Sequence, residues 1–307
     1  MEKFDTNGYS FGFVILHYQV EKVTIDCVAS ILNRVDSDNY QIVIVDNASP
    51  NKSGIALKKY YEDHKNIHVL MLEEGLGFSG GNNKGFKYAK YELHCDFIVM
   101  LNNDTLIIQD DFIKQIVDEY KQSQFAVLGP EIHLPNGKVD VYPFQILKLA
   151  ELDKDRERIH ALLKKNKSGI ESIELNTKHA IMKLIRWESW RHKLREDKPV
   201  PVRQEMVRLH GCCLIFSPVY VKAFDGLDNR TMFYGEEDIL FVRLIRNHML
   251  SVYQPKVKIM HMEQVSTGSK MKTAAKKRRY VYETHLETLD MLEALYHEDL
   301  DSLKGYI

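Results

Sequence analysis

Apolar runs and amphipathic stretches alternate through the first 130 residues of this 307-residue chain. Unbroken apolar runs predict strands, and apolar residues that recur every three to four positions predict helices. The predicted strands cover residues 11–17, 41–46, 67–72, 96–101 and 125–128. The predicted helices lie between them, at 20–32, 53–64, 82–91 and 110–122. Because strands without polar alternation are buried on both faces, we expect an α/β fold with a mainly parallel, Rossmann-like sheet and helices on both faces.

Polar residues follow three of the predicted strands. They are His17 and Tyr18 after the first strand, Asp46 and Asn47 after the second, and Asn102, Asn103 and Asp104 after the fourth. Ligands of open parallel sheets bind beyond the carboxyl ends of the strands. We therefore expect these polar residues to line a single binding site.

The pattern changes after residue 130. Residues 147–200 are highly charged with few strand-like runs, which predicts a helical insertion within 131–204. Strands are predicted again at 205–216 and 250–253, and helices at 218–224 and 236–247. A last amphipathic helix is predicted at 273–296, within a C-terminal segment of residues 266–307.

The composition narrows the classes of protein. Hydrophobic residues make up 44% and charged residues 28% of the chain, as in folded soluble proteins. A net charge of −1 disfavours a nucleic-acid partner, which would require a basic excess. The sequence carries no apolar run near the roughly 20 residues of a membrane span, and its first residues lack a signal-peptide core. The four cysteines show neither metal spacing nor a disulfide framework, so we expect a cytoplasmic protein.

Residues 75–80, GLGFSG, match the G-x-G-x-x-G dinucleotide fingerprint. That fingerprint should open directly from a strand, whereas Glu73 and Glu74 intervene here and would repel a pyrophosphate. We favour a flexible loop at the edge of a nucleotide, where Gly77 allows close backbone approach. The residues of this loop that can hydrogen-bond a ribose or phosphate are Asn82, Asn83 and Lys84. A nucleotide-dependent oxidoreductase or epimerase that uses GLGFSG is the alternative.

Acidic residues stand where they could hold a metal or accept a proton. Asp104 can bind Mg²⁺ or Mn²⁺ between two phosphates, although Asn102-Asn103-Asp104 also has the composition of a turn. Glu236, Glu237 and Asp238 open a predicted helix, where acids complement the helix dipole. Three acids exceed what the dipole needs, so one of them could serve as a general base. His261 on its own has the character of a structural histidine.

Six segments in this order and spacing resemble the inverting glycosyltransferases of family 2, which have the GT-A fold. They are VDNAS at 45–49, GFSGGNNKG at 77–85, LNNDT at 101–105, HGCCLIFS at 210–217, FYGEEDILFVR at 233–243 and His261. The resemblance covers residues 11–130 and 205–265 and is strongest to the branch that contains rhamnosyltransferases of bacterial surface polysaccharide synthesis. It implies a nucleotide-sugar-binding half at 1–130 and an acceptor-side half at 205–265.

The resemblance also implies roles for individual residues. Asp46 matches the residue that reads a pyrimidine base, with Tyr18 near the base or ribose and Asn82 and Asn83 along the nucleotide. Asp104 matches the last acid of the family's Asp-x-Asp metal motif, and Asn102 stands in place of its first acid. His261 matches the position that completes the metal site. Glu237 matches the catalytic acid, with Asp238 one step further on, and the choice between these two stays open.

The expected reaction is inverting transfer of a hexosyl or deoxyhexosyl group from a UDP- or dTDP-sugar to a hydroxyl of a saccharide acceptor. Such a reaction needs Mn²⁺ or Mg²⁺ to neutralise the leaving pyrophosphate and a carboxylate to take the acceptor's proton. The resemblance implies a role in capsule or other cell-surface polysaccharide synthesis. A non-catalytic scaffold that binds a nucleotide-sugar is a further alternative, but the presence of Asp104 and the acidic triplet counts against it.

Residues 176–195, NTKHAIMKLIRWESWRHKLR, combine basic residues and two tryptophans with an apolar stripe. This combination is typical of a helix that lies on anionic lipid, where a lipid-linked acceptor would be found. We therefore predict peripheral contact with the inner face of the cytoplasmic membrane. A helix packed on the catalytic domain, or on a second copy in a homo-oligomer, is the alternative and is the commoner use of an amphipathic helix.

Overall fold

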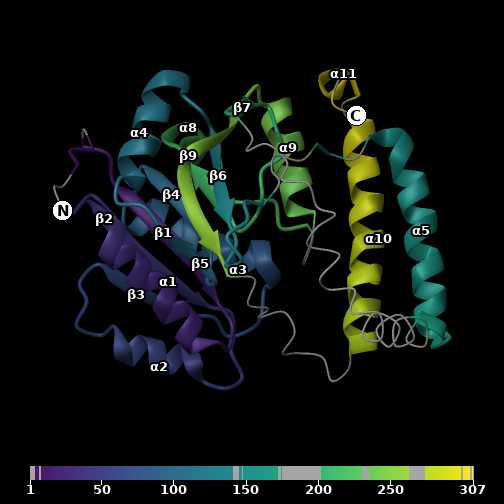
Figure 1. Ribbon diagram of the computed structural model, residues 1–307, viewed down its shortest axis with the longest axis horizontal. Helices are drawn as coiled ribbons and strands as arrows, with labels where there is room; N and C mark the ends of the chain where they lie inside the picture. The colour runs from purple at the N-terminus through teal and green to yellow at the C-terminus, as the bar shows by residue number, and fades with distance from the viewer. Residues whose placement is uncertain are drawn as a thin grey trace.

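A computed structural model of the chain describes residues 4–6, 8–140, 145–146, 148–171, 174, 202–230, 235–262, 274–298, 300–304 and 306. Nine strands in this part form one sheet in the order β3-β2-β1-β4-β8-β6-β9-β5, with β7 paired to β9 (Figure 1). The strands are β1 Phe11–His17, β2 Tyr40–Asp46, β3 Ile67–Met71, β4 Phe97–Asn102, β5 Thr105–Ile107, β6 Val127–His133, β7 Gln204–Glu205, β8 Cys213–Phe216 and β9 Ser251–His261. The predicted α/β class is confirmed.

The sheet has a parallel half and a mixed half. Strand β1 lies parallel to both β2 and β4, and β2 lies parallel to β3. Beyond β4, strand β8 runs antiparallel to β4 and β6, whereas β6 is parallel to β9. The described helices are α1 Glu21–Arg34, α2 Ser53–Tyr60, α3 Gly77–Lys87, η1 Tyr88–Glu92, α4 Phe112–Ser123, α5 Leu149–Lys167, α8 Pro218–Ala223, α9 Glu236–Arg246, α10 Ala274–Glu298 and α11 Leu300–Leu303.

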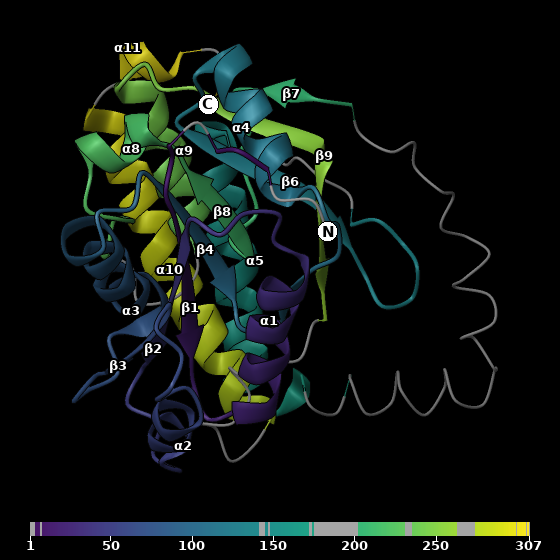
Figure 2. The same ribbon diagram turned by 90° about the vertical axis from the view of Figure 1, so that its left-hand side faces the viewer.

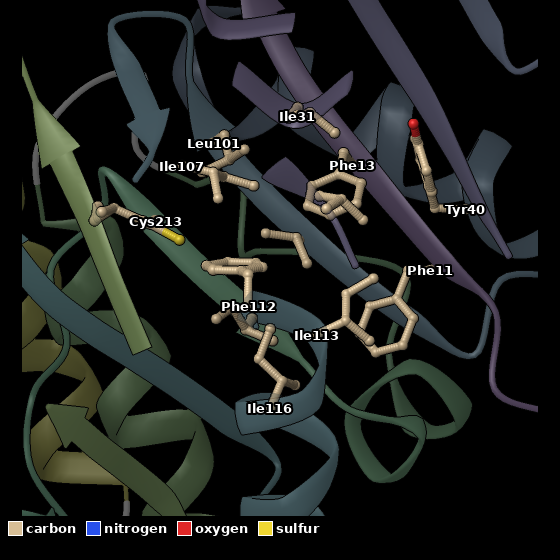
Figure 3. Packing of buried hydrophobic residues seen from close by; sticks show 14 of the residues in the cluster. Phe11, Phe13, Ile31, Tyr40, Leu101, Ile107, Phe112, Ile113, Ile116 and Cys213 are labelled. Carbon is tan, nitrogen blue, oxygen red and sulfur yellow. The ribbon is translucent and has the colours of Figure 1, made fainter. Parts of the chain in front are cut away.

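Helices cover both faces of the sheet. Phe13 and Ile15 of β1 pack on the face that carries α1 and α4, whereas Val14 packs on the face that carries α3, α8 and α9. Figure 3 shows the first cluster, in which Phe13 lies with Ile31 of α1 and Phe112 of α4. Because successive side chains of a strand point to opposite faces, burial of both faces explains the unbroken apolar runs.

Helix α9, which begins with the acidic triplet, is buried on two sides. Leu240 and Leu244 pack in the cluster on the sheet, whereas Ile239 and Val242 pack with residues of α10. Figure 1 shows α10 beside α5, at the end of the molecule away from the N-terminus, and Figure 2 shows the pair behind the sheet. Helix α10 therefore supports α9 from the side opposite the sheet.

The prediction of a flexible loop at 75–85 is wrong, because helix α3 begins at Gly77. A Cβ atom on Gly81 would lie 2.5 Å from Leu16 Cδ1, and one on Gly85 would lie 2.4 Å from Val14 Cγ1. The glycines therefore let the helix approach the sheet closely. Glycine costs about 1 kcal/mol relative to alanine in a helix, and here packing on the sheet outweighs this cost.

Strand β9 is longer than the predicted strand at 250–253. It continues through Pro255 to His261, and its register with β6 skips from Gln254 to Lys258. Pro255 lies in this irregularity, where a residue without an N–H is tolerated. His261 is therefore the last residue of the long strand β9, whereas the prediction placed it beyond a short strand.

The structure differs from the prediction at two further places in the sheet. The strand predicted at 205–216 is two short strands, β7 and β8, which pair with β9 and β4 respectively. Strand β5 has no counterpart in the prediction, because its three residues are too few to show a pattern. The basic segment at 176–195 lies outside the described residues, and the division of the chain into four segments stays a prediction.

Candidate active site

The polar residues that follow the parallel strands meet at one edge of the sheet, as predicted. In the β1–β2 register His17 stands opposite Asp46, and in the β1–β4 register Leu16 stands opposite Asn102. Tyr18 follows directly after β1 and is partly exposed at this edge. The edge therefore brings together residues that are about 85 positions apart in the sequence.

Asp46 presents a buried carboxylate at this edge, with only 2% of the residue exposed. Its Oδ2 accepts a hydrogen bond from the Ser49 N–H at 3.2 Å. Its Oδ1 is buried and has no hydrogen-bond partner among the described residues. A buried acceptor without a partner is unfavourable, so Asp46 Oδ1 is suited to receive an N–H from a ligand.

His17 lies beside Asp46 but does not neutralise it. The His17 ring hydrogen-bonds the hydroxyls of Thr24, at 2.7 Å, and Ser53, at 2.8 Å, and its Nε2 lies 3.9 Å from Asp46 Oδ1. Burial lowers the pKa of His17 to about 4, and the attraction of Asp46 offsets only part of this effect. At neutral pH His17 is therefore uncharged and fixes the turn between β1 and α1.

The buried histidine predicts that the fold loses stability in mild acid. The unfolded chain binds a proton at His17 below about pH 6.5, whereas the folded chain resists protonation down to about pH 4. The free energy of unfolding should therefore fall as the pH drops through this window, by about 2–3 kcal/mol from His17 at pH 4.5. Urea unfolding at pH 7.0 and 4.5 should show a smaller pH effect in His17→Gln. The exposed His160→Gln should match the wild type, and an unchanged pH effect in His17→Gln would contradict the prediction.

The start of α3 is held to the sheet edge by Asn47. The Asn47 side chain accepts from the Leu76 N–H at 2.8 Å and donates to the Gly77 carbonyl at 3.1 Å. Gly77 has a φ of +73°, which favours glycine at this helix start. Asn47, which was expected only to line the binding site, thus positions the start of α3.

The three polar residues predicted along the nucleotide lie in different environments. Asn82 is 1% exposed, and its Oδ1 is buried without a hydrogen-bond partner in the described part of the chain. Asn83 is half-buried, and its amide bonds to the main chain of Leu227. Lys84 is exposed. Their assignment as nucleotide ligands stays a prediction.

Asp104 and His261 lie side by side although 157 positions separate them in the sequence. The short strand β5 pairs with β9 so that Thr105 stands opposite His261. Asp104 Oδ1 lies 3.3 Å from His261 Nε2. Asn103 turns away, since its amide donates to the Thr24 hydroxyl at 3.1 Å, and Asn102 is held through its N–H to the Cys212 carbonyl at 2.9 Å.

The Asp104–His261 pair fits part of a divalent metal site. Carboxylate oxygen and imidazole nitrogen both bind Mn²⁺, and both side chains keep some exposure. Among the residues the structure describes, there is no group of three or more His, Cys, Asp or Glu side chains that could hold a metal ion. The two residues would therefore need further ligands from a phosphate group or water, as is usual for ions bound with nucleotides.

Glu237 is the acid of the triplet that contacts the segment around His210 and Gly211. Its Oε1 accepts from the Gly211 N–H at 3.2 Å, and its Oε2 lies 3.5 Å from Arg208 Nη2. Arg208 donates to both carboxylate oxygens of Asp238, from Nε at 2.9 Å and from Nη2 at 3.1 Å. Arg208 therefore binds Asp238 more closely than Glu237. Glu237 keeps the neutral Gly211 N–H as its hydrogen-bond donor, with the Arg208 charge further away.

The other two acids are less suited to take a proton from a substrate. Burial raises the pKa of Glu236 to about 8, with a further rise from the charge of Glu237, so Glu236 is mainly protonated at neutral pH. Burial also raises the pKa of Asp238, although Arg208 opposes the shift. The geometry favours Glu237, whose carboxylate accepts a hydrogen bond from the Gly211 N–H beside His210, as the acid of the triplet that could take a proton.

His210 joins the two halves of the site, and the sequence prediction gave it no role. Its ring lies 5.9 Å from that of His261, centroid to centroid, and its Nδ1 accepts from the Cys212 N–H at 3.0 Å. Burial lowers the pKa of His210, while the charges of Glu237 and Asp140 act against the shift. His210 therefore lies within electrostatic reach of Glu237 and close to the Asp104–His261 pair.

The comparison with known families identifies the family of the chain. Residues 13–188, more than half of the chain, match the family described as Glycosyl transferase family 2. The chain is a member of glycosyl transferase family 2. The predicted family is thereby confirmed, whereas the rhamnosyltransferase-like branch stays a prediction.

Two curated relatives of this family 2 protein act in glycan assembly according to their names. The "Minor teichoic acid biosynthesis protein GgaB" of Bacillus subtilis is 25% identical over 159 residues, which are 50% of this chain and 17% of GgaB. The "Low-salt glycan biosynthesis hexosyltransferase Agl10" of Haloferax volcanii is 26% identical over 121 residues, which are 39% of this chain and 36% of Agl10. The matched region thus spans well under half of each relative.

Two solved structures share the fold of the family 2 protein at 11% identity and a TM-score of 0.51. One is S. aureus TarS 1–349, where the match covers 97% of this chain and 75% of that chain. The other is the mannosyltransferase PcManGT from Pyrobaculum calidifontis in complex with GDP-Man and Mn²⁺, where it covers 99% and 78%. The predicted GT-A fold is confirmed. None of the helices described for this protein is both long and apolar enough to cross a bilayer.

Proposed function

We propose that this protein transfers a hexosyl or deoxyhexosyl group from a pyrimidine nucleoside-diphosphate sugar to a hydroxyl of a saccharide acceptor, with inversion at the sugar. The observation that carries this proposal is that Asp104 lies beside His261, while His210 lies between His261 and Glu237, 5.9 Å from the His261 ring and within electrostatic reach of Glu237. A proton acceptor and a partial metal site close together are what a single displacement of a nucleoside diphosphate requires.

Buried polar atoms support a nucleotide at the neighbouring part of this edge. Asp46 Oδ1, Ser79 Oγ and Asn82 Oδ1 are all buried and lack hydrogen-bond partners within the described ranges. Each lies on β2 or α3, the elements that meet at the Asn47 contact. A ligand with N–H and hydroxyl groups would satisfy these acceptors, and uracil or thymine offers an N3–H that suits Asp46.

In the proposed reaction Glu237 accepts the proton of the acceptor hydroxyl as that oxygen attacks the anomeric carbon. The hydrogen bond from the Gly211 N–H orients Glu237 Oε1 and keeps the carboxylate toward His210. Arg208 holds the adjacent Asp238 and lies on the same side of the helix start. When bound at Asp104 and His261, Mn²⁺ or Mg²⁺ would neutralise the charge that develops on the leaving pyrophosphate.

The relatives' names support a cell-surface glycan as the product, since one acts in teichoic acid and the other in glycan biosynthesis. The proposed acceptor is a lipid-linked saccharide, and contact with the inner face of the cytoplasmic membrane through residues 176–195 is part of this proposal. The oxidoreductase alternative has less support, because residues 72–76 separate β3 from α3, so GLGFSG does not open directly from a strand.

The proposal predicts a pyrimidine preference that depends on Asp46. Loss of a hydrogen bond to a buried carboxylate costs about 1.5–3 kcal/mol, so Asp46→Ala should weaken UDP or dTDP binding by about 10- to 100-fold. Calorimetry with UDP, dTDP and GDP in the presence of Mn²⁺ measures this effect. Asp63→Ala, which removes an exposed acid, is the control and should bind as the wild type does. A wild type that prefers GDP would overturn the role of Asp46.

A further inference from the structure

We propose that Asn83 is a positioning residue that couples the nucleotide-side helix α3 to the base-bearing helix α9 through the segment 224–230, here called the bridge. This inference rests on the proposed function, since it concerns the base Glu237 of that reaction. The bridge follows α8 and precedes α9 in the chain. It contacts α3 and its continuation on one hand and α9 on the other.

Asn83 makes the first set of contacts and uses both polar atoms of its side chain. Its Oδ1 accepts from the Leu227 N–H at 2.7 Å, and its Nδ2 donates to the Leu227 carbonyl at 2.8 Å. The neighbouring Gly226 has a φ of +122°, and a Cβ atom there would lie 2.1 Å from Asn83 Oδ1. The bridge backbone is therefore shaped around the Asn83 amide and would have to move if Gly226 carried a side chain.

Arg243 of α9 makes the second set of contacts from the opposite side of the bridge. Its Nη1 donates to the Gly226 carbonyl at 2.8 Å and to the Tyr220 hydroxyl at 3.0 Å. Its Nη2 lies 3.4 Å from Asp228 Oδ2, and its guanidinium carbon lies 4.8 Å from the Phe224 ring centroid. Arg243 stands six residues after Glu237 on the same helix, so a displaced Arg243 displaces the helix that carries the base.

A third set of contacts adds to the hold on the α3 side. Lys90, in the π-helical turn that continues α3, lies 2.7 Å from Asp225 and donates to the Phe224 carbonyl at 3.1 Å. Tyr91 donates to the same Asp225 carboxylate at 2.6 Å. The first residues and the centre of the bridge are thus tied to α3 and its continuation, while Arg243 ties the centre to α9.

These contacts give Asn83 a role different from that of a nucleotide ligand. One amide N–H and one oxygen lone pair of Asn83 already serve the Leu227 main chain, so both bonds hold the side chain toward the bridge. The buried neighbour Asn82, with its unpartnered Oδ1, keeps an acceptor for a ribose hydroxyl. Position 83 therefore acts on the reaction by setting the position of Glu237 relative to the donor, which is a matter of geometry rather than of donor affinity.

The test compares turnover with nucleotide affinity in two variants and their combination. Asn83→Asp keeps an acceptor for the Leu227 N–H but replaces the donor with a carboxylate oxygen that the Leu227 carbonyl repels. Arg243→Lys keeps the charge near Asp228 but cannot span both Gly226 and Tyr220. Each should lower kcat by about 10- to 100-fold, as a small misplacement of a catalytic group does. The dissociation constant of UDP or dTDP, measured by calorimetry with Mn²⁺, should change by less than about threefold.

Three controls separate positioning from general damage. Asn39→Asp removes a comparable hydrogen bond, from the Asn39 amide to the Tyr9 carbonyl. Asn39 makes no contact with the bridge among the described residues, so this variant should leave kcat unchanged. All assays run well below the melting temperature of each variant, so a loss of stability alone does not lower kcat. The double variant should be no slower than the slower single variant, because residues that act through one element are not additive.

The outcomes distinguish the proposals. Nucleotide binding that weakens in Asn83→Asp as much as kcat falls would make Asn83 a nucleotide ligand and overturn the bridge. A normal kcat in Asn83→Asp, or losses in kcat that multiply in the double variant, would overturn it as well. In each of these cases an active wild type leaves the proposed function standing. A wild type that neither binds UDP or dTDP nor transfers sugar from them would instead remove the proposed function on which the bridge rests.

Discussion

Glu237→Gln is expected to lower turnover by about 10²- to 10⁴-fold, the range for loss of a general base. Glutamine keeps the size of the side chain and the hydrogen bond from the Gly211 N–H, but it cannot take the acceptor's proton. Binding of UDP or dTDP should change little, because Glu237 acts on the acceptor hydroxyl. Nucleoside diphosphate release, followed at saturating donor, measures turnover, and calorimetry measures binding.

Substitutions of two other acids, Glu287 and Asp238, test whether the loss of turnover is specific to Glu237. Glu287→Gln alters an exposed acid of α10 and should behave as the wild type does. Asp238→Asn removes the partner of Arg208 and should lower stability more than Glu237→Gln does, since it leaves a partly buried guanidinium without its bidentate partner. If Asp238→Asn slows turnover at a temperature where it is folded and Glu237→Gln does not, the base is Asp238.

Asp104→Ala is expected to reduce transfer by about 10²-fold or more and to weaken binding of the nucleoside diphosphate in Mn²⁺. A metal that neutralises a leaving group contributes several kcal/mol, and about 1.4 kcal/mol corresponds to a tenfold change in rate. The variant removes the carboxylate 3.3 Å from His261, so the proposed metal site would lose one of its two side-chain ligands. Asp110→Ala, which removes an exposed acid paired with Arg34, is the control.

Metal removal provides an independent test of the same site. Excess EDTA should stop transfer by the wild type, and added Mn²⁺ or Mg²⁺ should restore it. Full activity of the wild type in EDTA would exclude the proposed role of Asp104 and His261, whatever the effect of the substitution. Activity that is lost in EDTA but unchanged in Asp104→Ala would place the ion elsewhere in the molecule.

The sequence is sufficient to predict the parallel half of the sheet. Its strands β1, β2 and β4 are buried on two faces, so each appears as a mainly apolar run that ends in a polar residue. The same reasoning predicts that His17, Asp46 and Asn102 meet, because carboxyl ends of parallel strands share one edge. Local pattern and global fold agree in this region, which makes the prediction reliable.

The sequence is insufficient where packing opposes local propensity. Glycine-rich residues 77–85 look like a loop, but their missing side chains are what allows α3 to lie against Leu16 and Val14. Pro255 looks like the end of a strand, but an irregularity in the β6–β9 register accommodates it. His210 has no periodic signal, because it lies in the turn before β8, and only the fold brings it to His261. These features depend on contacts between distant segments, which a single sequence does not display.

The most direct test of sugar transfer by this protein is a time-resolved proton NMR assay with UDP-, dTDP- and GDP-sugars, Mn²⁺ and a panel of saccharide acceptors. We expect UDP or dTDP to be released from a pyrimidine donor, together with a new anomeric signal of configuration opposite to that in the donor. The same signal should appear at least about 10²-fold more slowly with Glu237→Gln. Retention of the donor's configuration, or release at equal rates by wild type and Glu237→Gln, would contradict a single displacement assisted by Glu237.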